Sequence, residues 1–348
     1  MTGARPLDDF AGRLIAWQAQ HGRHDLPWQN TRDAYRIWLA EIMLQQTQVT
    51  TVIPYYARFL ERFPDIRTLA AAPAGEVMAL WSGLGYYARA RNLHACARAI
   101  VERHAGEFPR EAAAIAALPG IGRSTAAAIA AFAHGARGAI LDGNVRRVLA
   151  RCFGVDGFTG EKKVESRLWR LAESLLPAGG IESYTQALMD LGATVCTRGK
   201  PDCARCPLRG ECIALEQDRV GQLPTPRPRK ALPQRSARYL ILLHDKRVLL
   251  EQRPPSGIWG ALLCLPELSD GEDPRLVARQ RYACSVESIE ARPSLTHGFT
   301  HFTLTLQPLL CTVSTVEPHA AQPGLQWLPL DALDRAALPA PIRKLLAR

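Results

Sequence analysis

The sequence predicts two folded parts joined by a linker, an all-helical part first and a smaller α+β part after it. Residues 1–215 are rich in Ala, Leu and Arg at helical spacing, and prolines and glycines fall where helix boundaries are expected. Residues 216–235 hold four prolines and five basic residues, a composition typical of an extended linker. In residues 236–348, runs such as RYLILLH and FTLTLQPLL alternate like strands, and a short helix is expected near the end.

Composition and charge narrow the class of protein. Of the 348 residues, 47% are hydrophobic and 22% are charged, so disorder over most of the chain is excluded. The formal net charge of +10 favours a polyanionic partner, although many basic proteins have none. No run approaches the roughly 18 apolar residues of a membrane span, and the first residues lack the apolar core of a signal peptide. We therefore expect a cytoplasmic protein without a membrane partner.

Four of the nine cysteines lie within 17 residues, in the segment CTRGKPDCARCPLRGEC. Structural zinc usually takes its ligands as two tight pairs, whereas this compact loop has a single tight pair, which favours a [4Fe–4S] cluster. The spacing matches none of the common ferredoxin patterns, so zinc remains an alternative. Basic residues between the cysteines, such as Arg198 and Lys200, suit a loop that touches phosphate, although a solvated charged loop would have them too. The expected metal ligands are Cys196, Cys203, Cys206 and Cys212.

The segment AAIAALPGIGRSTAAAIAAF predicts two helices joined by a tight turn. The turn glycines, Gly120 and Gly122, leave backbone N–H groups uncovered beside the start of the second helix, which is a ready site for an anion. Hairpins of this form, here with Arg123 and Ser124 after the turn, bind the DNA backbone without reading sequence. An ordinary helical hairpin with a glycine turn would have the same pattern.

Two carboxylates are candidates for acid–base chemistry. Glu41 falls on the apolar stripe of DAYRIWLAEIMLQQTQV, where desolvation would raise its pKa and keep it ready to donate a proton. The alternative is a rim residue paired with an arginine. Asp142, in AILDGNVRRVLAR, directly precedes a predicted helix, so it is expected to cap that helix and to remain ionised, able to stabilise positive charge. Asn144 could fix that carboxylate or a water molecule.

The segment WSGLGYYARARN mixes aromatic and basic side chains, including Tyr86, Arg89 and Arg91. Such a mixture suits a surface that stacks nucleobases or grips phosphates. Buried tyrosines with arginines at the surface would look the same in sequence.

Taken in their order along the chain, these segments resemble the helix-hairpin-helix DNA glycosylases that contain an iron–sulfur cluster. Within that superfamily, LPWQ, EIMLQQTQV, TVIPYY, WSGLGYYARARNLH and ALMDLGATVC resemble the MutY adenine DNA glycosylases. The segment RPPSGIWGALLCLPEL is similar to the Nudix-like domain of that family. The resemblance implies a multidomain fold, with an all-α helix-hairpin-helix glycosylase domain carrying a [4Fe–4S] loop and an α+β Nudix-like domain.

The resemblance also implies a monomeric, monofunctional enzyme that excises adenine opposite 8-oxoguanine or G from double-stranded DNA, at the nucleoid if the cell is bacterial. Glu41 would protonate adenine at N7 and Asp142 would stabilise an oxocarbenium-like sugar. Asn144 and Tyr86 would line the pocket, and Gln46 would lie at the opening left in the base stack. DNA contacts would come from Arg89, Arg91, Gly120, Gly122, Arg123, Ser124, Arg198 and Lys200, and the cluster ligands would be Cys196, Cys203, Cys206 and Cys212.

The chemistry fits these residue types. Adenine is a poor anionic leaving group, and protonation of its ring lets it leave as a neutral molecule. The breaking bond leaves positive charge on the deoxyribose, which a nearby carboxylate stabilises electrostatically. The base must first flip out of the helix, at a cost of roughly a few kcal/mol.

Two positions separate this chain from relatives. Ser124 stands where bifunctional glycosylase/lyases carry a lysine that forms a Schiff base, so efficient β-elimination is not expected. Phe299, Thr300 and His301 stand where the family usually has Phe-Ser-His for 8-oxoguanine, so recognition is expected to survive with altered packing. The Glu-rich REx2EE helix of active Nudix hydrolases does not occur in the sequence, so this domain is expected to recognise and not to hydrolyse.

Two alternatives remain from the sequence. An endonuclease III-like pyrimidine glycosylase/lyase is disfavoured by Ser124 and by the long C-terminal domain. A non-catalytic DNA-binding or redox-signalling iron–sulfur protein would leave unexplained why an acid, Glu41, lies in so apolar a helix.

Overall fold

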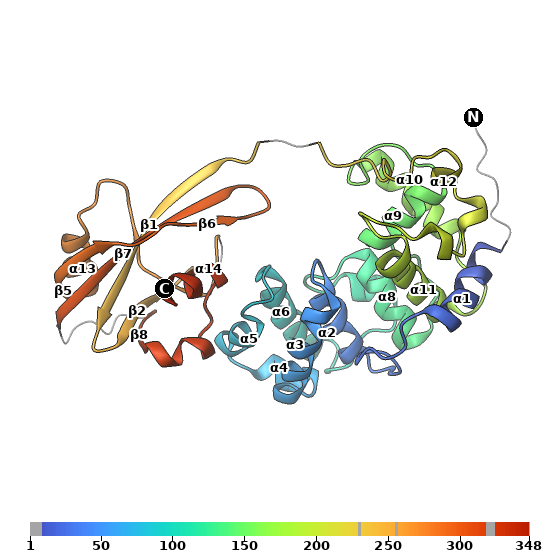
Figure 1. Cartoon of the computed structure of the whole chain (residues 1–348). Coiled ribbons are helices and arrows are strands. Elements are labelled where there is room, and N and C mark those ends of the chain that lie inside the picture. Colours follow the sequence, from blue (N-terminus) through green and yellow to red (C-terminus); the bar gives the residue numbers. More distant parts are fainter. Residues whose placement is uncertain (1–8, 229–230, 255–256, 318–323, 348) are drawn as a thin grey trace. The chain divides into compact units, whose positions relative to one another are not determined.

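The computed structural model describes residues 9–228, 231–254, 257–317 and 324–347. The chain forms two compact units, each assembled from two separate stretches of sequence (Figure 1). The first unit combines Met1–Ala70 with Ala95–Arg229, and the second combines Ala71–His94 with Lys230–Arg348. A short helical segment therefore belongs with the C-terminal part, a division that the predicted boundaries, placed at the two ends of the linker, do not anticipate. Among the described helices, none is long and apolar enough to cross a membrane.

Helices make up most of the first unit. In chain order they are α1 (Phe10–His21), α2 (Ala34–Leu44), α3 (Val49–Arg62), α4 (Ile66–Ala71), α6 (Ala88–Arg103), whose first residues up to His94 belong to the second unit, α7 (Ala112–Ala116), α8 (Arg123–His134), α9 (Gly143–Cys152), α10 (Lys162–Ser174), α11 (Ile181–Asp190) and α12 (Ile213–Glu216). A π-helical turn η1 (Leu191–Val195) and the 3-10 turns η2 (Cys203–Arg205) and η3 (Arg209–Glu211) lie between α11 and α12, and the four clustered cysteines are within or next to these turns.

Local capping fixes where the site-bearing helices begin and end. The Asp33 carboxylate accepts a hydrogen bond from the backbone N–H of Tyr35 at 2.9 Å and starts α2. The Asp142 carboxylate accepts from the N–H of Val145 at 2.8 Å and starts α9, as the sequence predicted. Each such cap stabilises a helix by about 1 kcal/mol. Gly135 ends α8 in the left-handed conformation (φ 66°), which glycine adopts without strain.

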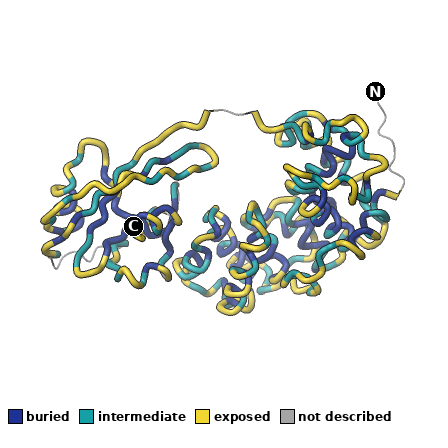
Figure 2. Tube along the Cα trace, viewed as in Figure 1, coloured by how far each residue is buried: buried dark blue, intermediate teal, exposed yellow. Residues whose placement is uncertain are grey.

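The core of the first unit forms where α1, α9, α10 and α11 meet. Its buried side chains include Leu14 of α1, Leu149 of α9, Leu168 of α10 and Leu188 of α11. The alanines of α8 are buried as well, and their small side chains let neighbouring helices pack closely. The buried stretches of the trace in Figure 2 follow these helices.

The second unit contains a mixed eight-stranded sheet with the central order β3-β2-β1-β7-β5. Its long strands β1 and β7 pair in parallel, from Gln234 opposite Thr303 to Leu243 opposite Thr312. The strands are β1 (Gln234–His244), β2 (Arg247–Gln252), β3 (Leu263–Cys264), β4 (Glu267–Leu268), β5 (Cys284–Ala291), β6 (Leu295–Gly298), β7 (Thr303–Val316) and β8 (Leu325–Pro329), and the helices are α5 (Ala74–Trp81), α13 (Pro274–Tyr282) and α14 (Ala340–Leu346). The α+β part predicted from alternating runs is therefore present.

The segment after α5 is attached to the C-terminal part by hydrogen bonds to backbone carbonyl groups. Ser82 Oγ donates to the carbonyl oxygen of Leu338 at 2.8 Å, and Tyr87 OH donates to the same atom at 3.3 Å. Arg91 Nη1 donates to the carbonyl oxygen of Gly260 at 2.9 Å. These bonds explain why residues 71–94 belong to the second unit.

Candidate active site

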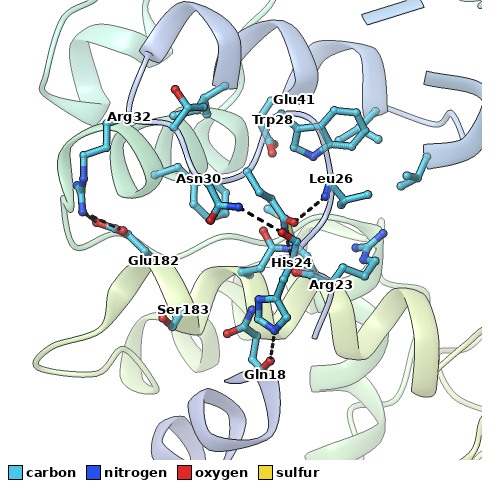
Figure 3. A pocket seen from close by; sticks show the side chains of 18 residues that line it. Gln18, Arg23, His24, Leu26, Trp28, Asn30, Arg32, Glu41, Glu182 and Ser183 are labelled. Atoms are coloured by element: carbon cyan, nitrogen blue, oxygen red, sulfur yellow. Dashed lines mark hydrogen bonds and ion pairs between the residues drawn. The ribbon is translucent and has the colours of Figure 1, made fainter. Parts of the chain in front are cut away.

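A cavity of about 460 Å³ opens in the first unit, beside Glu41 (Figure 3). Its size is within the usual range for small-molecule sites. In Figure 3, Glu41 and Trp28 lie on the same side of the cavity, and an ion pair between Arg32 and Glu182 closes another side. The lining residues are Gln18, Arg23, His24, Leu26, Trp28, Gln29, Asn30, Thr31, Arg32, Ile37, Glu41, Leu44, Val49, Phe132, Glu182, Ser183, Gln186 and Met189.

Glu41 projects from α2 into this cavity among apolar side chains. Its neighbours on the helix, Ala40 and Ile42, are buried, and Ile37 and Leu44 line the cavity with it. Burial, and secondly the negative charge of Asp142, raise the pKa of Glu41 to about 8. Among the described residues, Glu41 forms no ion pair with an arginine, so its position differs from that of a paired rim residue. At neutral pH this carboxyl group carries a proton.

Asp142 is the second acid, at the N-terminal end of α9. Burial raises the pKa of Asp142 above its usual value, while backbone N–H groups of Val145 and Asn144 and the charge of Arg147 favour its ionised form. Glu41 receives no such stabilisation of its anion. When the two acids hold a single proton between them, that proton is therefore bound to Glu41. Asp142 is outside the set of residues that line the cavity, and it acts on Glu41 through its charge.

Arg147 links the start of α9 to the cysteine segment. Its Nη2 donates to Asn144 Oδ1 at 2.7 Å and to the carbonyl oxygen of Gly192 at 2.6 Å. Its Nε donates to the carbonyl oxygen of Cys196 at 2.7 Å. A Cβ atom on Gly192 would lie 2.5 Å from that of Asn144, so η1 can approach α9 this closely only with glycine at that position.

The four predicted metal ligands line one common hollow. Arg151, which is 2% exposed, lies beside it and donates from Nη1 to Cys196 Sγ at 3.3 Å and to the carbonyl oxygen of Thr197 at 2.7 Å. A fifth cysteine, the buried Cys152 of α9, also lines the hollow. Within the described ranges, no three His, Cys, Asp or Glu side chains are arranged to bind a metal ion, so the ligand set Cys196, Cys203, Cys206 and Cys212 stays a prediction.

The predicted hairpin is formed by α7 and α8. Gly120 has φ 75°, and a Cβ on Gly122 would meet no atom within 4 Å, so the backbone at this turn is open. Ser124 Oγ accepts a hydrogen bond from the N–H of Leu141 at 2.9 Å, which ties the hairpin to the residue before Asp142. Arg123 is exposed, forms an ion pair with Glu173 and lies 3.9 Å from the ring centroid of Trp169.

Other predicted DNA-contacting residues have different environments. Gln46 is exposed, with φ 57° in the turn between α2 and α3, a conformation that is uncommon outside glycine. Arg198 and Lys200 are exposed on the cysteine segment. Arg89 is only 9% exposed and donates to the carbonyl oxygens of Leu84 and Gly85, within its own segment. Tyr86 is 52% exposed and belongs, like Arg89 and Arg91, to the second unit.

The loop with Phe299, Thr300 and His301 is next to a cluster of aromatic rings. The ring of Phe299 stacks on Phe302 at 4.5 Å and contacts His297 edge-on at 4.7 Å. The buried Trp259 lies 5.8 Å from Phe299, measured between ring centroids. Thr300 and His301 are exposed at the tip of the loop, where a ligand can reach them.

Sequence analysis missed one wall of the cavity. Residues 23–32 supply Arg23, His24 and Trp28, to which no role was assigned, although LPWQ was noted as part of the family resemblance. The fully buried Asp190 was missed as well. The only signal for the loop was its unusual mixture of tryptophan, proline and charged residues without helical periodicity.

The raised pKa of Glu41 makes the stability of the fold depend on pH. An unfolded glutamate has a pKa near 4.5, so between this value and about 8 the folded state keeps a proton that the unfolded state has lost. The contribution of the neutral carboxyl is complete below pH 4.5 and is lost as the pH rises through about 8. Glu41→Gln, which stays neutral, should therefore gain stability over the wild type by at most about 1 kcal/mol per pH unit in this range. Thermal unfolding at several pH values measures this, and a difference that stays constant with pH would contradict it.

Two family models match the chain. Residues 39–174 match the HhH-GPD superfamily of base excision DNA repair proteins, and residues 238–348 match the NUDIX domain. A solved thermostable thymine-DNA glycosylase is 31% identical, with a TM-score of 0.53, over 60% of this chain and 95% of that one. The all-α glycosylase and Nudix-like fold predicted from the sequence is confirmed.

Relatives match over nearly the whole length. The adenine DNA glycosylase of Buchnera aphidicola subsp. Acyrthosiphon pisum (strain APS) is 36% identical over 338 residues, which cover 97% of this chain and 96% of the relative. The adenine DNA glycosylase of Homo sapiens is 33% identical over 96% of this chain and 73% of its own length. The family resemblance found in the sequence is thereby confirmed, and the chain belongs to the adenine DNA glycosylases, DNA repair enzymes that hydrolyse the N-glycosidic bond of adenine.

Proposed function

We propose that this glycosylase removes adenine paired with 8-oxoguanine or G in double-stranded DNA, and that Glu41 is its proton donor. The observation that carries the proposal is the burial of Glu41 in the wall of a cavity, where its pKa is about 8. A group with this pKa is protonated at neutral pH and can still lose its proton readily.

In this mechanism the adenine flips out of the duplex into the cavity. Trp28 and Leu26 offer apolar surface to the base, and the amide of Gln186 offers a hydrogen-bonding edge. Glu41 gives its proton to N7 of the base, so that adenine leaves as a neutral molecule. Asp142, held by the N–H groups of α9, stabilises the positive charge on the sugar, and Asn144 fixes that end of α9 through Arg147. We also propose a role in adenine binding for Tyr86.

The cofactor we propose is a [4Fe–4S] cluster held by Cys196, Cys203, Cys206 and Cys212. Support comes from the residues present, because all four cysteines line one hollow and Arg151 supplies a cation beside it. When bound, the cluster would cross-link the cysteine segment. Exposed Arg198 and Lys200 would then be presented on a defined loop to DNA phosphates.

Further DNA contacts are proposed at the hairpin turn of Gly120, Gly122, Arg123 and Ser124, whose backbone N–H groups suit a phosphate. Gln46 would enter the opening left by the flipped base. Arg89, buried in its own segment, would shape the surface that Arg91 and Tyr86 present. Ser124 cannot form an imine, so the enzyme is proposed to be monofunctional.

Thr300 and His301 are proposed to read 8-oxoguanine, with Phe299 anchored in the aromatic cluster. The domains proposed for this work are residues 1–215 and 236–348, with the linker 216–235 between them. We further propose that the enzyme acts as a monomer in the cytoplasm, at the nucleoid in a bacterium.

The central test is single-turnover release of adenine from duplexes with A opposite 8-oxoguanine, G or T. We expect release opposite 8-oxoguanine and G, and a loss of at least about a hundredfold in rate with Glu41→Gln, because the proton donor is gone. Duplex affinity should change little. Wild-type protein loaded with iron that releases no adenine from any of these duplexes would overturn the proposed function.

Phe299→Ala should weaken the preference of the enzyme for A opposite 8-oxoguanine over A opposite G. Removing the ring frees the loop that presents Thr300 and His301, so the rate with A opposite 8-oxoguanine should fall by about tenfold or more. The rate with A opposite G should change much less. A matched control is Phe108→Ala, which removes an aromatic ring that packs on Trp38 in the first unit. Equal losses on both duplexes with Phe299→Ala would argue against the lesion-reading role.

Cys203→Ser should lower the iron and sulfide content of purified protein, because one of four ligands is lost. Cys96→Ser removes a buried thiol outside the cysteine segment and should keep the wild-type content. Elemental analysis of both variants measures this. Zinc in place of iron in the wild-type protein, or unchanged iron in Cys203→Ser, would overturn the cofactor assignment.

A further inference from the structure

A single irregular loop forms much of the cavity wall around Glu41. Eight of the 18 lining residues come from positions 23–32, between α1 and α2. The loop is folded on itself: Gln29 Nε2 donates to the carbonyl oxygen of Arg23 at 2.9 Å, and Gln29 Oε1 accepts from the N–H of Leu26 at 3.1 Å. Asn30 Nδ2 donates to the carbonyl oxygen of His24 at 3.3 Å. These bonds give the loop a shape but do not attach it to α11 across the cavity.

Two ion pairs attach the loop to α11, and they differ sharply in burial. At one end Arg32 pairs with Glu182 at 2.8 Å, and the two side chains are 66% and 38% exposed. At the other end Arg23 pairs with Asp190, whose side chain is 0% exposed. An exposed pair contributes little because water and salt screen it. The buried pair therefore sets where the loop lies.

The carboxylate of Asp190 is bound by two residues, Arg23 and Gln186. Its carboxylate accepts from the backbone N–H of Arg23 at 2.9 Å, from Arg23 Nε at 2.7 Å and from Arg23 Nη2 at 2.6 Å. It also accepts from the side-chain amide of Gln186, a cavity residue, at 2.9 Å. Binding both the backbone and the guanidinium of Arg23 fixes the position and the direction of the chain where the loop begins.

We propose that Asp190 is a positioning residue for the proton donor, because its buried pair with Arg23 holds the 23–32 loop against Glu41 and keeps water away from that carboxyl group. The inference rests on the proposed function of Glu41 and deepens it. The side chains that the loop brings to the cavity wall include the apolar Leu26 and Trp28, beside Glu41. Without the ion pair between Arg23 and Asp190, the loop could move outward and water could reach Glu41.

The charged groups around Glu41 determine the direction of the effect. Arg23, His24 and Arg32 face the cavity from the loop, Glu182 faces it from α11, and Asp142 acts from the start of α9. Hydration of the cavity would weaken the first cause of the raised pKa of Glu41, which is burial. The pKa of Glu41 would then fall toward its ordinary value, and the acid would lose its proton at lower pH.

The test is Asp190→Asn in the full chain loaded with iron, compared with the wild type. The rate of adenine release from a duplex with A opposite 8-oxoguanine is followed between about pH 6 and 9. We expect the alkaline fall in rate to begin at lower pH, by about half a unit or more, and the rate at pH 8 and above to drop by about two- to threefold or more. Hydrogen exchange at residues 24–31 should speed up, while exchange in the cysteine segment stays the same.

Asp156→Asn is the matched control, because it removes the same type of charge from an ion pair with Arg219, outside the cavity lining. It should keep the wild-type pH profile and loop exchange. Should Asp190→Asn fail to fold, Arg23→Lys keeps the charge but loses the second donor, and it should shift the profile in the same direction by less.

The outcomes separate the two proposals. Wild-type protein that releases no adenine would sink the proposed function, and the exchange of residues 24–31 in Asp190→Asn would still show whether the anchor holds the loop. A uniform loss of rate with an unshifted pH profile would overturn the positioning role, since a merely structural defect behaves in that way. Unchanged exchange in the loop would overturn it as well.

Discussion

The electrostatic coupling between Glu41 and Asp142 is the constraint on which the rest of the site depends. Burial raises the pKa of both carboxyl groups, and the charge of Asp142 raises the pKa of Glu41 further. Two anions that interact away from water would be unfavourable, so we infer that the pair carries a proton. Only Asp142 has backbone N–H groups and an arginine to stabilise its anion, so the proton belongs on Glu41. The fold therefore favours a protonated carboxyl group at Glu41 and an ionised one at Asp142, although the two side chains are chemically similar.

Helix α9 connects this pair to the cysteine segment. Asn144, Arg147 and Arg151 follow one another at intervals of three and four residues, which places them along one face of the helix. From that face Arg147 reaches the carbonyl oxygen of Cys196 at 2.7 Å, and Arg151 reaches its sulfur at 3.3 Å. The glycine at position 192 lets η1 come near enough for these contacts. The position of Asp142 and the path of the cysteine segment are therefore set by the same helix.

The parts of the site that depend on interactions between neighbouring residues could be predicted from the sequence. Glu41 was recognisable because helical periodicity predicts which residues share a buried face, and Asp142 because caps are determined by neighbouring residues. The pair of Arg23 and Asp190 spans 167 positions and has no such local signal. The attachment of residues 71–94 to the C-terminal part was equally hidden, because its acceptors are the backbone carbonyl groups of Leu338 and Gly260, which any residue supplies. The proposed ligand set came from spacing and from the family resemblance, and the arrangement of the sulfurs in space could not be derived from spacing.

Two arginines of the first unit, the partly buried Arg23 and the buried Arg151, have different partners for their charge. Arg23 meets the carboxylate of Asp190, which offsets the cost of removing a guanidinium from water. Arg151 is more deeply buried, at 2% exposure, yet among the described residues its acceptors are the sulfur of Cys196 and the backbone carbonyl oxygens of Thr197, Arg198 and Leu223. Carbonyl groups satisfy its N–H groups but do not neutralise its charge. Neutral thiols would leave that charge unbalanced, whereas thiolates bound to a metal centre would balance it. The buried charge of Arg151 beside Cys196 therefore supports the proposed cluster, whose ligand set stays a prediction.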